Sequence, residues 1–236
     1  MATPTADVMA IASLLKRERF YRDTAQWDLC RATFHPDAAE TYINVAWLVP
    51  FLTRQRTLLD PQTDRTPSRY EGSVEEFLRQ SAQMHKGKVN IIHSSFDPVD
   101  IRVRGNRAIS EAFCLVTSSL TLRAVEYELA SHMRLFHRLQ KLSDSGEWRI
   151  LSVESSYVRD RLVTAFPSSD ASSPLVMTNE VQAYPKCYRH LALVMLNRGL
   201  KPRPNLPHED TPESVRRISD RNSAFLDSAE VFAGDI

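Results

Sequence analysis

The chain has 236 residues, of which 42% are hydrophobic and 25% charged, so it can bury a core in one medium-sized domain that carries an extension. Its 30 basic and 29 acidic side chains leave a net charge of +1, which argues against a nucleic-acid partner. No apolar run approaches the roughly 20 residues that span a bilayer and no leader pattern begins the chain, so we expect a cytoplasmic protein without a membrane partner.

The N-terminal part predicts three helices. Apolar side chains at Val8, Ile11, Leu14 and Leu15 have helical spacing, which predicts a helix over residues 6–24. A second helix is expected at residues 27–34, where Pro36 stops it, and an extended segment follows at 38–48. Residues 53–72 predict a long exposed loop. The third helix is expected at 73–85, because it begins with a capping box and Gly87 lies just past its end.

From residue 88 onward the apolar period changes to that of strands. Strand-like runs are VNIIHSSF, VDIRV, AISEAFCLVTSSL, VEYELASHMRLFHRLQKL and EWRILSVESSYV, separated by turn signals that include Gly105-Asn106. Helices followed by antiparallel strands predict an α+β fold, with the helices packed on one face of a strongly curved sheet. Such a sheet forms a cone with an interior cavity, where a few polar groups would point into an apolar pocket.

The C-terminal part differs from this domain. Residues 161–185 are rich in Ser and Pro and predict a strap, whereas residues 186–236 predict a helical extension. One helix carries Tyr188, Leu191 and Met195 on a single face and ends at Gly199, and a second begins at Pro212. We therefore expect a barrel domain at residues 1–160 and an extension that packs on it, caps the cavity or wraps a partner subunit.

The absence of their sequence motifs argues against several classes of site. The six glycines are isolated from one another, so no Gly-rich phosphate cradle can form, and G-x-S-x-G and H-E-x-x-H do not occur. Cys30, Cys114 and Cys187 are far apart and in no C-x-x-C pair, so we interpret them as buried apolar residues. The histidines lack compact metal-site spacing. We therefore predict no cofactor and no metal.

Three segments in this order carry a resemblance to a known family. They are D-x-x-x-W-D at residues 23–28, Phe34-His-Pro-Asp-Ala at 34–38, and Glu-Trp-Arg-Ile at 147–150. Over about residues 8–160 the chain resembles the nuclear transport factor 2-like superfamily, and most closely its SnoaL-like branch, which includes polyketide cyclases, scytalone dehydratase and ketosteroid isomerase-type enzymes. The resemblance implies a cone-shaped α+β barrel and a homodimer formed through the open face of the sheet.

Scytalone dehydratase is the most useful comparison within that branch. The spacing of Asp23, Trp27, Pro36 and Tyr42 is similar to that of its helix and first strand, and His93 stands where its strand carries a histidine partnered with the aspartate. The resemblance implies a catalytic pair of Asp23 and His93, with Tyr42 nearby to hold a water or polarise a carbonyl. Its second catalytic histidine falls near Ala112, so a two-histidine dehydration is not reproduced here.

Chemistry supports this pair independently of the resemblance. A neutral imidazole can take up and return a proton near pH 7, and a carboxylate on its other nitrogen fixes the tautomer and stabilises the charged form. Each residue also has a purely structural interpretation. Asp23 could pair with Arg19 on its own helix or lie in solvent, and His93 could make only structural hydrogen bonds.

Other side chains are candidates for contact with a substrate. Asn44 shares a strand face with Tyr42, and His132 and Arg134 would be carbonyl or anion ligands if their face lines the cone. The alternation itself favours a solvated or dimer-facing outer surface for that polar face. Trp27 and Phe113 complete the set, although Trp27 could instead belong to the core between helix and sheet.

Two functions follow from the sequence. The first is a cofactor-independent lyase, isomerase or cyclase that uses histidine–aspartate acid–base catalysis on a small hydrophobic oxygenated metabolite, such as a polyketide or terpenoid of secondary metabolism. The alternative is a non-catalytic ligand-binding or dimeric interaction module of the same fold.

Overall fold

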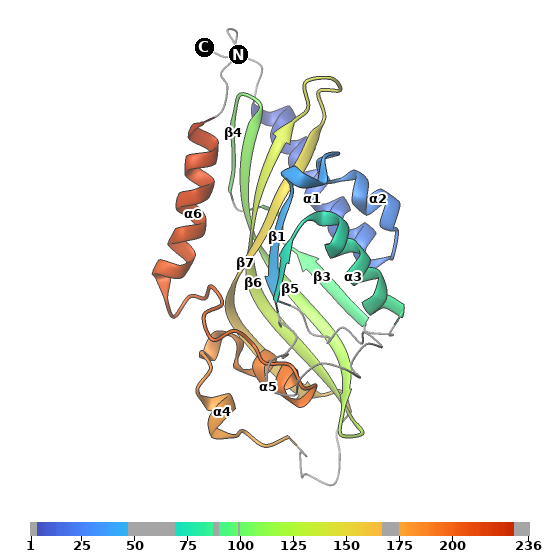
Figure 1. Cartoon of the computed structure of the whole chain (residues 1–236), viewed down its shortest axis with the longest axis vertical. Coiled ribbons are helices and arrows are strands. Elements are labelled where there is room, and N and C mark those ends of the chain that lie inside the picture. The colour runs from blue at the N-terminus through green and yellow to red at the C-terminus, as the bar shows by residue number, and fades with distance from the viewer. Residues whose placement is uncertain (1–3, 47–68, 87–89, 99, 167–174, 229–236) are drawn as a thin grey trace, which may run out of the picture.

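The computed structural model describes residues 4–46, 69–86, 90–98, 100–166 and 175–228 (Figure 1). Its helices are α1 (Pro4–Asp23), α2 (Trp27–Ala32), η1 (Ala38–Glu40), α3 (Val74–Lys86), α4 (Asn179–Gln182), η2 (Lys186–Tyr188), α5 (Arg189–Asn197) and α6 (Pro212–Asp227). Its strands are β1 (Tyr42–Ala46), β2 (Arg69–Gly72), β3 (Asn90–Ser95), β4 (Asp100–Arg104), β5 (Arg107–Leu122), β6 (Val125–Lys141) and β7 (Trp148–Thr164). None of the described helices is long and apolar enough to cross a membrane.

The strands form one curled, unclosed sheet. Their order is β2-β1-β7-β6-β5-β3, with β4 paired to β5, and every pair is antiparallel except β1 with β7. The ladder between β6 and β7 shifts register after His132 and again after Arg138. Such bulges increase local twist and bend the strands, which suits a cone. The predicted α+β cone is confirmed.

Helices cover both faces of this sheet (Figure 1). On the inner face, α1, α2 and α3 bury an apolar cluster that includes Ile11, Phe34, Ile43 and Phe77. At the far end of β5, β6 and β7, η2 and α5 build a second cluster around Tyr188. On the outer face, α6 lies alongside β4, β5 and β6 and contacts all three strands.

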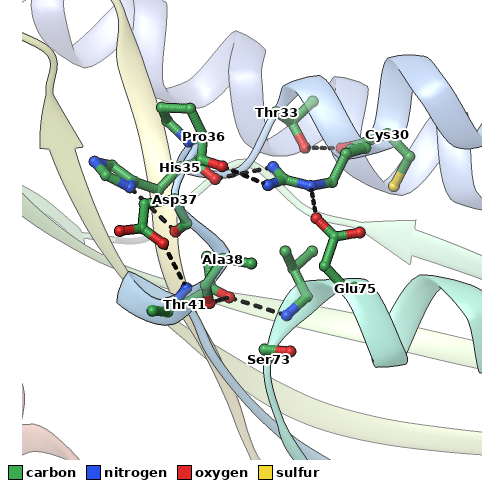
Figure 2. A network of polar contacts seen from close by, with 12 residues as sticks. Cys30, Thr33, His35, Pro36, Asp37, Ala38, Thr41, Ser73 and Glu75 are labelled. Atoms are coloured by element: carbon green, nitrogen blue, oxygen red, sulfur yellow. Dashed lines mark hydrogen bonds and ion pairs between the residues drawn. The ribbon is translucent and has the colours of Figure 1, made fainter.

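Polar contacts in the turn between α2 and β1 fix where α2 ends and how the chain continues (Figure 2). Pro36 cannot donate a backbone hydrogen bond, and its carbonyl oxygen accepts one from Arg31 at 2.8 Å. Arg31 also donates to Glu75 at 2.6 Å, in the first turn of α3. Asp37 caps η1 by accepting a backbone N–H at 2.9 Å. These bonds fix the point at which the chain enters β1.

Two predicted segments need correction. The end of the loop expected at 53–72 is β2, which pairs with β1; residues 53–68 lie outside the described residues. The strap includes the short helix α4, whose N-cap Thr178 accepts a hydrogen bond from the N–H of Val181 at 3.3 Å. Propensity alone could not show β2, because a four-residue strand is held chiefly by its partner.

The extension is tied to the outer face by charged contacts as well as apolar ones. Val215 and Ile218 of α6 pack with Phe136 of β6. Beside them Glu154 is 2% exposed and binds Arg221 of α6 at 2.6 Å, with Arg138 of β6 at 3.7 Å. The domain boundaries remain predictions, but α6 uses a buried carboxylate of the barrel as its anchor.

Replacing Glu154 with alanine is expected to lower the free energy of unfolding by about 3 kcal/mol, because it leaves two guanidinium groups facing each other without their shared anion. The control is Glu147→Ala, which removes an exposed carboxylate paired with Arg149 and should cost less than about 1 kcal/mol. Urea unfolding of both variants measures the difference. Equal losses would contradict the anchoring role of Glu154.

Candidate active site

A cavity of about 100 Å³ lies between α1, α3 and the inner face of the sheet. Most of its wall is apolar, with a few polar side chains, as expected for a pocket that binds a small molecule. The acidic and arginine side chains in the wall all come from α1. The lining residues are Arg19, Arg22, Asp23, Val45, Phe77, Ser81, Met84, His85, Ile91, His93, Val116, Met133, Leu135 and Tyr157.

Asp23 and His93 meet in this cavity. Asp23 is the last residue of α1, and its Oδ1 lies 2.7 Å from Nδ1 of His93. Its Oδ2 accepts the backbone N–H of His93, also at 2.7 Å. Both carboxylate oxygens are therefore committed to one residue of β3. This arrangement fixes the orientation of the ring and excludes the interpretation of Asp23 as a solvated helix residue.

The other ring nitrogen of His93 is occupied by Arg22. Nη2 of Arg22 lies 2.5 Å from Nε2 of His93. A guanidinium group can only donate hydrogen bonds, so Nε2 must accept and the ring proton must be on Nδ1, where Asp23 accepts it. The two neighbours thus select the same neutral tautomer. Its basic lone pair points at Arg22, which also lies over the ring of Phe77, 5.4 Å from its centroid.

The electrostatic surroundings keep His93 neutral. Burial and the positive charge of Arg22 lower the pKa of His93 to about 3, although Asp23 acts in the opposite direction. Burial acts to raise the pKa of Asp23, but its hydrogen bonds from His93 and the charge of Arg22 hold that pKa below its ordinary value. At neutral pH the site contains a carboxylate, a neutral imidazole and a guanidinium.

A second polar group lies beside the dyad. Glu18 and Arg19 of α1 are 1% and 5% exposed, and Arg19 Nε lies 2.9 Å from Glu18 Oε2. Arg19 Nη2 lies 3.5 Å from Nε2 of the buried His137 on β6. Sequence reasoning named Arg19 only as a possible partner of Asp23 and placed neither Arg19 nor Arg22 in the cavity wall. Their spacing could have indicated that they are buried, because Arg19 lies four residues after Leu15 and Arg22 three residues after Arg19, on the apolar face of the helix.

The remaining candidates on the strands lie on the outer face, which corrects their predicted placement. Tyr42 donates to Glu71 at 2.9 Å and accepts from Asn44 at 2.8 Å, away from the cavity. Arg134 donates to Glu111 at 2.6 Å and to Glu209 of the extension at 2.9 Å. Alternation gives which residues share a face but not which face is the inner one.

His132, Phe113 and Trp27 are also absent from the cavity wall. His132 and Phe113 share the outer face with Arg134, and the side chain of Phe113 is 46% exposed. Trp27 packs against the core cluster and meets the ring of His85 edge-on at 5.2 Å. The opposite face of β6 supplies the wall instead, through Met133 and Leu135.

Burial of two neutral histidines predicts that the fold weakens in acid. The pKa of His93 is about 3 and burial holds that of His137 well below its ordinary value, whereas an unfolded histidine titrates near pH 6.5. Between these values the unfolded chain binds protons that the folded chain does not, so the free energy of unfolding should fall as pH falls. Each histidine can contribute a slope of at most about 1.4 kcal/mol in the free energy of unfolding per pH unit.

Urea unfolding between pH 6 and pH 4 measures this slope. Asp160 raises the pKa of His190, so that group is protonated in both states through most of this window. His137→Phe should reduce the slope by up to about 1.4 kcal/mol per pH unit. A slope of zero in the parent protein, or an unchanged slope in the variant, would contradict the assignment of these histidines as buried and neutral.

The curled sheet, the helices on its inner face and the cavity between them make up the predicted α+β cone. A family model described as the SnoaL-like domain matches residues 3–154, and the chain belongs to this family.

Known proteins give the following likenesses. The chain is 25% identical over 175 residues to pea pathogenicity protein 2 of Fusarium vanettenii, covering 73% of this chain and 62% of that one. It is 27% identical over 186 residues to an uncharacterised protein of Aspergillus terreus, covering 73% and 58%. The chain therefore spans about 60% of the length of these relatives.

Among solved structures, a nuclear transport factor 2-like superfamily protein from Salmonella enterica has a TM-score of 0.42 at 16% identity, covering 72% of this chain and 99% of that one. A Novosphingobium aromaticivorans protein provisionally assigned as a scytalone dehydratase has a TM-score of 0.45 at 13% identity, covering 75% and 97%.

Proposed function

We propose that the protein is a cofactor-independent isomerase or lyase that moves a proton at a carbon next to a carbonyl group. The observation that carries the proposal is the placement of Asp23, His93 and Arg22 in one mostly apolar cavity. A base, the carboxylate that orients it and a cation for a developing oxyanion are the parts that such a reaction needs.

The reaction begins with an exchange of partners at His93. The carbonyl oxygen of the substrate accepts a hydrogen bond from Arg22, whose guanidinium then leaves Nε2. The freed Nε2 takes a proton from the carbon next to the carbonyl, and the electron pair moves onto the oxygen to form an enolate beside Arg22. Asp23 stabilises the imidazolium that results.

The imidazolium then completes the reaction in one of two ways. In an isomerase it returns the proton to a distant carbon as the enolate electrons move back, so that a double bond shifts into conjugation. In a lyase it protonates a hydroxyl group on the neighbouring carbon, which leaves as water while the enolate electrons form the new double bond. Both outcomes conserve atoms and charge without another reactant.

Arg22 has the donor capacity for this role. Its Nε is buried and has no hydrogen-bond partner among the described residues, so the guanidinium can bind an oxygen while keeping its place over Phe77. The substrate class that fits the cavity is a small, mostly apolar molecule with one carbonyl group. A short polyketide or a terpenoid of secondary metabolism would have this chemistry.

A second function is favoured by one observation. Nε2 of His93 is engaged by Arg22 and the pKa of His93 is low, so the dyad could serve only to hold the guanidinium of Arg22 for an anionic ligand. The protein would then be a non-catalytic carrier. The homodimer and the cytoplasmic location remain predictions in both cases.

The test uses cyclohex-3-enone, a one-ring ketone whose conversion to cyclohex-2-enone requires only the proposed proton shift. The wild-type protein should accelerate the rise in enone absorbance above the rate in buffer with free imidazole, with saturation by substrate. Exchange of the ring protons into deuterated water should be accelerated too. Saturable binding of the ketone with neither reaction accelerated would favour the carrier instead.

A further inference from the structure

A group of metal-ligand side chains lies outside the cavity, where the loop before α6 returns to η2. One ligand atom each from Cys187, His208 and Asp210 lies within 4.8 Å of the other two. Cys187 and His208 are buried, at 4% and 7% exposure, whereas Asp210 faces solvent. None of the three lines the cavity. Their positions in the chain, at 187, 208 and 210, explain why spacing alone predicted no metal.

His208 is the residue that points to a ligand. Its Nε2 lies 3.3 Å from Oγ1 of Thr211, and its ring packs against Tyr188 with centroids 5.7 Å apart. Its Nδ1 is buried and has no hydrogen-bond partner in the part of the chain that the structure describes. A buried polar atom without a partner is costly and uncommon. In the tautomer in which Nε2–H donates to Thr211, the free lone pair lies on Nδ1. A metal-bound imidazole usually donates its other ring N–H in this way.

Cys187 and Asp210 supply the complementary charge. The sulfur of Cys187 and a carboxylate oxygen of Asp210 lie within 4.8 Å of each other. A divalent cation between them would compensate the negative charges of a thiolate and a carboxylate together. Binding would then release the thiol proton to solvent.

We propose that Cys187, His208 and Asp210 bind a zinc ion. A thiolate with an imidazole selects zinc over magnesium or calcium, which prefer ligand sets made of oxygen. In tetrahedral coordination the ligand atoms lie about 3.5 Å apart, so distances that now lie within 4.8 Å need to shorten by at most about 1.3 Å. The exposed side next to Asp210 leaves the fourth position to water. The ion would link η2 to the loop before α6 and so join two segments of the extension.

Metal content and cobalt spectroscopy test the site directly. The full chain, stripped with a chelator and dialysed against zinc, should retain about one zinc per chain. Cobalt(II) in its place should give a thiolate-to-cobalt charge-transfer band. Both signals should be lost in Cys187→Ala and His208→Ala and kept in Cys114→Ala, which removes a buried cysteine of β5 outside the cluster.

A surface variant keeps the test decisive if the buried ones do not fold. Asp210→Ala removes an exposed ligand and should weaken zinc binding about tenfold or more while circular dichroism stays unchanged. A folded wild-type protein without the cobalt band would overturn the proposal. So would zinc affinity that is unaltered in Asp210→Ala. Neither result bears on the ketone reaction, which uses other residues.

Discussion

Replacing His93 with alanine should lower the rate of cyclohex-3-enone isomerisation by about 10²- to 10⁴-fold, the range that a positioned acid–base group contributes. The loss is expected because two neighbours orient the His93 ring in the cavity wall, with Asp23 2.7 Å from its Nδ1 and Arg22 2.5 Å from its Nε2. Initial rates under saturating ketone measure it. Asp23→Asn should lower the isomerisation rate at least about 10-fold, because asparagine no longer selects the correct imidazole tautomer and no longer supplies the negative charge that stabilises the imidazolium.

The matched control is His132→Ala. It removes another imidazole from the same sheet, but on the outer face, so the isomerisation rate should stay within twofold of that of the parent. Circular dichroism separates a loss of catalysis from a loss of fold, and His93→Gln provides a larger side chain if alanine leaves a damaging cavity. Full activity in folded His93→Ala would exclude His93 as the base.

Replacing Arg22 with glutamine is expected to separate two effects that oppose each other. The pKa of His93 should rise, because after burial the charge of Arg22 is the largest cause of its depression. The imidazole then becomes a stronger base, yet isomerisation should slow by about 10²- to 10³-fold because the enolate oxygen loses its cationic donor. Nitrogen NMR of the His93 ring measures the first effect and the ketone assay the second.

Arg17→Gln is the control for this variant, since it removes an equal charge from an exposed position of α1. It should change neither the rate nor the His93 resonance. If Arg22→Gln left the pKa of His93 where it was, Arg22 could not be the group that masks the base. If it raised that pKa and also raised the rate, Arg22 would be an inhibitor of the base and not its partner in catalysis.

Most of the fold was predictable because its longer elements each have their own periodic signal. The residues at helical spacing in 6–24, the long alternating strands and the stop at Pro36 are local features, and α1, β5–β7 and the end of α2 follow them. The pairing of Asp23 with His93, 70 positions apart, came from the family resemblance and its spacing, since no local pattern connects a helix end to a distant strand.

The errors have a common physical origin. Strand alternation grouped His132 with Arg134 correctly, but whether that face or the face of Met133 pointed inward depended on how the whole sheet curled. Arg22 was overlooked because a charged helix residue is ordinarily exposed. Its burial makes sense only once the opposing imidazole is in place. Contacts between distant segments, including Cys187 with His208, are set by the fold as a whole.

The central claim is that a substrate oxygen displaces Arg22 from His93. A crystal structure with phenol, whose flat ring and oxygen mimic the dienolate of the ketone probe, tests this most directly. The account predicts the phenol oxygen within hydrogen-bond distance of Arg22, and Nε2 of His93 released from the guanidinium and facing the ring. Phenol bound in the cavity with Arg22 still on Nε2 would contradict it.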